Sequence, residues 1–213
     1  WTTLATLILT VCGVNFMGPN TIGDFPPTAY YLISSIASFL SIVLPFSFFL
    51  FFGKRKLSDT VLVEKNGVLN SVLLVFAGLA VSVLMNIPAN LISQLLEGAG
   101  LNGDANTADL LALTPVQALT MFVSVVLVAP VTEEFAFRSV TTAVMRRWGD
   151  WPAVIFSALI FGMAHYSIQS LPVVLTAGFV MALLYVRTRN IWVNIFVHML
   201  NNLLATLPIA LEG

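Results

Sequence analysis

The chain has 213 residues, of which 58% are hydrophobic and only 9% are charged, and its mean hydropathy is +0.95. A soluble domain carries roughly a quarter charged residues, so this composition indicates an integral membrane protein. The net charge of −1 excludes a basic surface for nucleic acid, and the single cysteine, Cys12, excludes both a disulfide framework and a cysteine-based metal site.

The apolar segments predict seven membrane-spanning helices. They cover approximately residues 1–17, 28–52, 67–96, 115–147, 151–165, 171–185 and 191–207. The first residue is Trp1, so we expect the chain to begin partway through a longer product. The third segment is long enough to be tilted, or to finish as an interfacial segment after Pro88. Without repeats or linkers, residues 1–213 are expected to form one all-α transmembrane domain.

Basic residues predict the orientation of these helices. Apart from Arg138, they fall in three connections: Lys54, Arg55, Lys56 and Lys65; then Arg146 and Arg147; then Arg187 and Arg189. With seven spans, these connections lie on the same side of the membrane. Because Lys and Arg are enriched in cytoplasmic loops, we expect that side to be the cytoplasm.

Two glutamates and an arginine interrupt the apolar segment 115–147. Each such side chain costs about 3 kcal/mol at the centre of a helix in hydrocarbon. Three of them together therefore indicate a specific structural or functional role. Glu134 and Arg138 are four residues apart and are expected to form an ion pair. Glu133 points about 100° away, which leaves it for other chemistry. Pro130 is expected to kink or begin the helix nearby. The simpler alternative is a buried ion pair that only holds helices together.

Both histidines of the chain, His165 and His198, lie in predicted spans. Asn202 follows His198 by four residues and shares its helix face, and Asn201 is close to it. Counted at about 1.5 Å per residue from the expected cytoplasmic ends, Glu133 and these groups lie about 12–21 Å deep. Burying each one unsatisfied is costly, so we expect them to meet around a small polar cavity. A lone histidine is more often a packed, hydrogen-bonded residue.

Such a set can hydrolyse amide bonds. A carboxylate takes a proton from water that a histidine holds, while a second histidine and an asparagine donate hydrogen bonds to the developing oxyanion. The same side chains can instead hold a divalent metal that activates the water. Other intramembrane protease patterns, His-Glu-x-x-His, Gly-x-Ser-x-Gly and Gly-x-Gly-Asp, do not occur in the sequence.

Three motifs carry a resemblance to a known family. They are Glu133-Glu134-x-x-x-Arg138, Phe161-x-x-x-His165 and His198-x-x-x-Asn202. In this order on successive apolar helices, within residues 128–202, they resemble the signature of the CPBP family. That family comprises the type II CAAX prenyl proteases and their bacterial relatives, also called the Abi family.

The resemblance implies an all-helical intramembrane endopeptidase in a bacterial plasma membrane. Glu133 and His165 would hold the water, His198 and Asn202 would form the oxyanion site, and the Glu134–Arg138 pair would support them. Family members have been described as metalloproteases and as glutamic proteases. A site with two histidines and no cysteine favours the metal-free mechanism. A metal-dependent one would place a divalent ion such as zinc on Glu133, His165 and His198.

The implied substrate is a membrane-associated or lipidated peptide or protein, with membrane lipids as further partners. Bacterial relatives of the family are linked to bacteriocin maturation or immunity and to membrane-protein regulation. Two alternatives stay open at this point. One is a non-catalytic membrane immunity or scaffold protein of the same family. The weaker one is a proton-coupled transporter, which usually shows paired repeats, whereas here the polar residues fall in the last four predicted spans.

Overall fold

The computed structural model describes residues 27–101, 115–165 and 168–212. The predicted first span, 1–17, lies outside these residues, as does most of each long polar loop. The named elements are all helices. They are α2 (Pro27–Phe52), α3 (Leu57–Thr60), α4 (Val68–Gly98), α5 (Pro115–Phe122), η2 (Val123–Val128), α6 (Ala129–Glu133), η3 (Glu134–Thr141), α7 (Thr142–Met145), η4 (Arg146–Trp148), α8 (Asp150–Met163), α9 (Leu171–Thr188) and α10 (Ile191–Glu212).

The all-α class and the membrane assignment are confirmed. Among the described residues, three helices are long and apolar enough to cross a membrane: Val68–Gly98, Ala118–Trp148 and Leu171–Thr188. Shorter apolar helices cover Val43–Phe52, Asp150–Met163 and Ile191–Leu207. Each predicted segment from 28–52 onward therefore corresponds to a helix or a continuous helical run. That the whole chain forms one domain stays a prediction.

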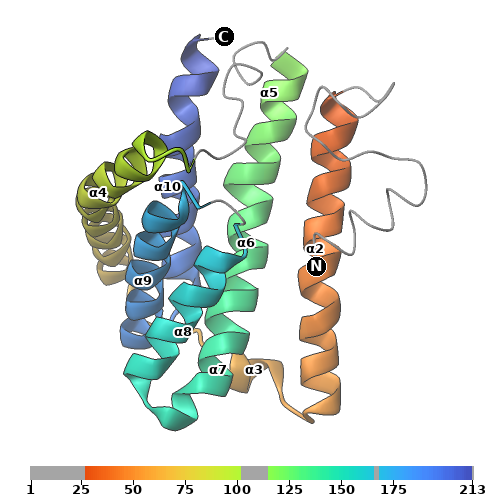
Figure 1. The fold of residues 1–213 in the computed structure, drawn as a ribbon. Coiled ribbons are helices and arrows are strands. Elements are labelled where there is room, and N and C mark those ends of the chain that lie inside the picture. Colours follow the sequence, from red (N-terminus) through yellow and green to blue (C-terminus); the bar gives the residue numbers. More distant parts are fainter. Residues whose placement is uncertain (1–26, 102–114, 166–167, 213) are drawn as a thin grey trace.

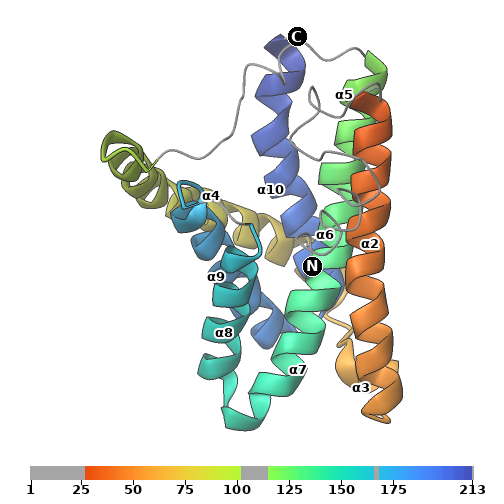
Figure 2. The same ribbon diagram turned by 45° about the vertical axis from the view of Figure 1, so that its right-hand side comes forward.

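The helices differ in how they cross the bundle. α2, the run from α5 to α7, and α10 stand roughly parallel, with α8 and α9 beside them (Figure 1). α4 crosses at a steep angle and packs against α9 and α10 (Figure 2). Whether it crosses the membrane at a tilt or finishes as an interfacial segment after Pro88 stays a prediction. α8 and α9 pack closely at Gly178, where a Cβ would lie 2.9 Å from Phe161 Cδ1 and 3.3 Å from Ala158 Cα.

The basic connections gather at one end of the molecule, the lower end in Figure 1. Backbone hydrogen bonds join two of them: Glu64 N–H donates to Arg189 O at 2.9 Å, and Ile191 N–H donates to Leu62 O at 3.0 Å. Tyr185, which is 1% exposed, accepts a hydrogen bond from Leu62 N–H at 3.1 Å through its hydroxyl. The connection after α3 is thereby fixed to the α9–α10 turn. The basic connections lie on a common side of the molecule, which agrees with the predicted topology. The compartment that this side faces stays a prediction.

The run from Pro115 to Trp148 is helical throughout, but it changes register around Pro130. The segments η2 and η3 are π-helical and flank the short α-helix α6 that contains this proline. Proline lacks an N–H group and disturbs the hydrogen-bond ladder, as the sequence predicted. π-helical turns inside longer helices are frequent at functional sites, and these two border Glu133 and Glu134.

Candidate active site

The expected ion pair lies at the centre of the polar cluster. Arg138 Nε is 3.1 Å from Glu134 Oε2, and both side chains are fully buried. The Arg138 guanidinium also lies over the Phe161 ring, with Cζ 4.6 Å from the ring centroid. A buried charge is tolerated only when it is paired and hydrogen-bonded, so each partner requires the other. This pairing is the one that the four-residue spacing predicted.

Asn194 on α10 is a member of this cluster that the sequence reasoning missed. It is fully buried, and its Nδ2 donates to Glu134 Oε2 at 3.2 Å and to the Met181 carbonyl. A signal was present, because Asn194, His198 and Asn202 follow one another at intervals of four residues. That spacing puts a stripe of polar groups on one face of an apolar helix.

His198 lies between the two glutamates. Its Nδ1 is 3.0 Å from Glu134 Oε1, and its Nε2 is 3.8 Å from Glu133 Oε2. A carboxylate paired with a guanidinium only accepts hydrogen bonds, so we assign the Nδ1 proton to His198 from its partner. In the neutral ring, Nε2 then carries a lone pair that is directed toward Glu133. Glu134 thereby fixes both the tautomer and the orientation of the ring.

Glu133 occupies a different environment from its neighbour. Its side chain is 24% exposed, whereas that of Glu134 has no exposure. The 3.8 Å between Glu133 Oε2 and His198 Nε2 exceeds a direct hydrogen bond. Two polar atoms at that separation can share one water molecule. The two adjacent carboxylates therefore offer different chemistry: one is buried and neutralised, and the other is accessible and faces a nitrogen lone pair.

His165 reaches this cluster through an aromatic ring. It lies in the turn that follows α8 and is exposed, and its Nδ1 is 2.9 Å from the Phe161 carbonyl oxygen. Its ring centroid is 4.7 Å from that of Phe161, which in turn is 5.7 Å from that of His198. The structure therefore brings Glu133, Glu134 and His198 together directly and places His165 on the phenyl ring beside them.

Asn202 and Asn201 bond to two other helices. Asn202 Nδ2 donates to the Val125 carbonyl in η2 at 2.9 Å. Asn201 Oδ1 accepts a hydrogen bond at 3.3 Å from the hydroxyl of Ser82, a residue of α4 that is 1% exposed. The polar face of α10 therefore contacts the helix that carries the glutamates on one side and the tilted α4 on the other.

The residues suggested for a metal do not converge in this structure. Within the part of the chain that the structure describes, no group of three or more His, Cys, Asp or Glu side chains is placed to hold an ion. His198 and Glu133 face each other, but His165 turns toward the carbonyl of Phe161. Whether the reaction needs a metal stays a prediction.

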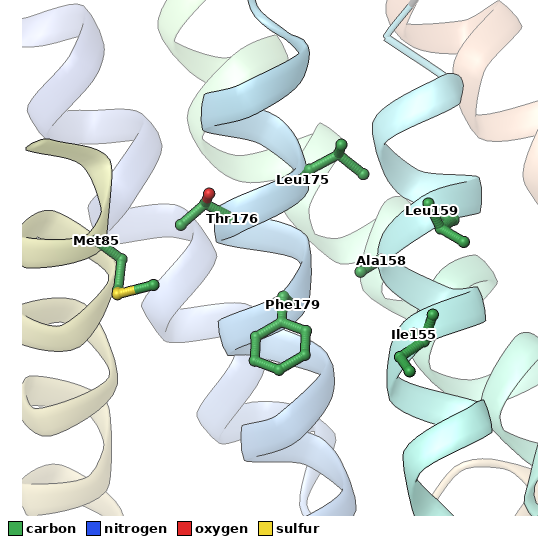
Figure 3. Close-up of a pocket in the computed structure, with 7 residues that line it drawn as sticks. All are labelled: Met85, Ile155, Ala158, Leu159, Leu175, Thr176 and Phe179. Atoms are coloured by element: carbon green, nitrogen blue, oxygen red, sulfur yellow. The ribbon is translucent and has the colours of Figure 1, made fainter. Parts of the chain in front are cut away.

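A separate cavity lies between α4, α8 and α9 (Figure 3). It has a volume of about 270 Å³ and is lined by apolar side chains such as Met85, Leu159 and Phe179. Its hydroxyl group, on Thr176, donates to the Pro172 carbonyl of its own helix at 2.7 Å. Because no ionisable side chain lines this cavity, the candidate chemistry belongs to the polar cluster on η3 and α10.

Comparisons with known proteins agree with the family that the three motifs indicated. Residues 115–204 match the family model "Type II CAAX prenyl endopeptidase Rce1-like". A Bacillus subtilis (strain 168) protein named "Putative membrane peptidase YdiL" is 31% identical over 140 residues, which cover 65% of this chain and 57% of that relative. The match therefore spans less than two thirds of the relative's length. No solved structure matches. The chain is thus similar to an endopeptidase family over residues 115–204 and to a relative named as a membrane peptidase.

Proposed function

We propose that this chain is an intramembrane endopeptidase that hydrolyses a peptide bond of a membrane-associated or lipidated peptide or protein. The proposal rests on one observation: the two adjacent glutamates differ in burial and in their partners. Glu134 is buried and bound to Arg138, while the partly exposed Glu133 faces His198 Nε2 at 3.8 Å. A cluster that served packing alone would gain nothing from leaving one carboxylate open.

Glu133 is the general base in this proposal. A water held between its Oε2 and His198 Nε2 loses a proton to the carboxylate and attacks the scissile carbonyl carbon. The carboxylic acid then returns that proton to the leaving amine. Glu134 takes no part in the proton transfer, because Arg138 and Asn194 already occupy it, and instead holds His198 in place. By the resemblance, His165 would help to hold the same water.

The oxyanion that forms in this step needs hydrogen-bond donors. The motif resemblance assigns this role to His198 and Asn202. Asn202 gives one N–H to the Val125 carbonyl, and an amide nitrogen carries a second. A neutral His198 that holds the water through its Nε2 lone pair has no N–H left for the oxyanion, because Glu134 accepts its Nδ1–H, so Asn202 is the donor that this geometry supports. Removing one oxyanion donor typically lowers the rate by about 10²–10³-fold.

The proposed location is a bacterial plasma membrane, in keeping with the bacterial relative and the apolar helices. A lipidated or membrane-associated substrate can reach a site among these helices from within the bilayer. No cofactor is part of the proposed reaction. Bacteriocin processing or immunity is one setting for such an activity, and the substrate panel below includes it.

The test is hydrolysis by protein purified in detergent. Prenylated peptides and bacteriocin-leader peptides are incubated with the wild type, with Glu133→Gln and with Glu97→Gln, in which an exposed glutamate of α4 is changed. We expect cleavage of at least one peptide by the wild type and by Glu97→Gln, and none by Glu133→Gln. If the folded wild type cleaves nothing across the panel, a non-catalytic immunity or scaffold role replaces the peptidase.

A further inference from the structure

The π-helical register of η2 leaves one backbone carbonyl without a donor from its own helix. Ala129 N–H donates to Ser124 O, five residues earlier, so it is not used by Val125 O. In the same register the next donor, for Val125 O, belongs to residue 130. That residue is proline and has no N–H group. The Val125 carbonyl is therefore freed by the combination of a wide turn and a proline.

A freed carbonyl in an apolar helix requires another partner, because no water of the bilayer core can supply one. Asn202 of α10 is that partner: its Nδ2 donates to Val125 O at 2.9 Å. Pro130 stands three residues before Glu133, and Asn202 stands one turn after His198. This single bond therefore ties the helix of the general base to the helix of the histidine, close to both.

We propose that Pro130 is a positioning residue of the active site. By removing a backbone donor it reserves the Val125 carbonyl for the Asn202 amide. The bond then fixes the direction of the second Asn202 N–H and helps to set the 3.8 Å separation of Glu133 and His198. The predicted effect on rate rests on the proposed function, whereas the effect on the contact does not.

This proposal differs in its consequences from a proline that only bends the helix. Replacing Pro130 with alanine supplies the missing N–H, which competes with Asn202 for the same carbonyl. The change is also favourable for the helix itself, since alanine is the best helix former and proline the poorest. Stability is therefore expected to be kept or raised while activity falls. Pro88, inside α4, provides a matched control for the loss of a helical proline.

The test is a double-mutant cycle of wild type, Pro130→Ala, Asn202→Leu and the double variant. In the wild-type background, Asn202→Leu leaves the Val125 carbonyl unsatisfied and lowers the thermal midpoint. In the Pro130→Ala background the backbone satisfies that carbonyl, so the same change has little effect on the midpoint. Interaction energies of this kind appear as non-additivity in the cycle. Additive midpoint shifts would overturn the proposal.

Kinetics separate positioning from a structural role. We expect Pro130→Ala to lower kcat by about tenfold with KM nearly unchanged, because the lost orientation acts in the transition state. Pro88→Ala is expected to keep the wild-type kcat. A Pro130→Ala enzyme with wild-type kcat would refute the positioning role, even if Asn202→Leu fails to fold. If neither the wild type nor any variant cleaves a peptide, the proposed peptidase function fails. The thermal midpoints of the double-mutant cycle then still test whether Pro130 reserves the Val125 carbonyl for Asn202.

Discussion

Replacing Arg138 with alanine should destabilise the protein more than any change to a surface charge. The side chain is fully buried, lies 3.1 Å from Glu134 Oε2 and covers the Phe161 ring at 4.6 Å. Alanine removes the counter-charge and the packing at once. Glu134 would keep hydrogen bonds from Asn194 and His198, which are the remaining partners that the structure gives it.

The expected cost follows from breaking one side of a buried ion pair, which lowers the free energy of unfolding by about 3–5 kcal/mol. The lost contact with Phe161 adds to this, and the two remaining hydrogen bonds of Glu134 reduce it. Arg146 provides a control of the same spacing, because its Nε is 3.0 Å from Asp150 Oδ1 in an exposed pair. Exposed ion pairs contribute about 0.2–1 kcal/mol to stability. Arg146→Ala should therefore hardly change the free energy of unfolding.

The assay is unfolding in detergent micelles, followed by circular dichroism for wild type and both variants at one detergent concentration. A double variant, Glu134→Gln with Arg138→Met, should recover part of the loss because it leaves no unpaired charge. An Arg138→Ala protein that unfolds within about 1 kcal/mol of wild type and keeps full activity would contradict the separation of the two glutamates into a support and a base.

Two further predictions concern the packing and the chemistry of the site. Gly178→Val should lower both stability and activity, because a Cβ there lies 2.9 Å from Phe161 Cδ1 and would displace the ring that both histidines contact. Overpacking of this kind costs about 1–3 kcal/mol, and Gly98→Val, where a Cβ meets nothing within 4 Å, is the control; equal thermal midpoints for the two variants would disprove the packing argument. Activity should survive exhaustive chelation, with metal content measured by mass spectrometry on active protein. Stoichiometric zinc, with activity lost on chelation and restored by added zinc, would replace the metal-free mechanism and recast Glu133 as a ligand or as the base beside a bound hydroxide.

Local spacing was enough to predict part of this site. The apolar runs located the helices because length and hydropathy suffice for a span. The pairing of Glu134 with Arg138 followed from their four-residue separation, which is a property of one helix. The disturbed hydrogen-bond ladder near Pro130 followed from its missing N–H. Each of these features depends on residues that are close in the chain.

Contacts between helices could not be predicted in the same way. The counted depths suggested that His198 and Glu133 share a slab near mid-membrane, but depth does not say which nitrogen meets which carboxylate. The place of Asn194 depends on how α10 is rotated against η3, and the place of His165 on where α8 ends. The π register was also hidden, because the same apolar letters fit α-helical and π-helical turns. It decides which carbonyl Asn202 can reach.

The most direct test of the central claim is the rate of peptide hydrolysis by Glu133→Gln at matched stability. Glutamine keeps the shape of the side chain but cannot accept a proton from water. With a cleaved peptide in hand, the account predicts a thermal midpoint like that of wild type and no measurable turnover. Turnover within about tenfold of wild type, a barrier change of only about 1.4 kcal/mol, would remove Glu133 from the chemistry.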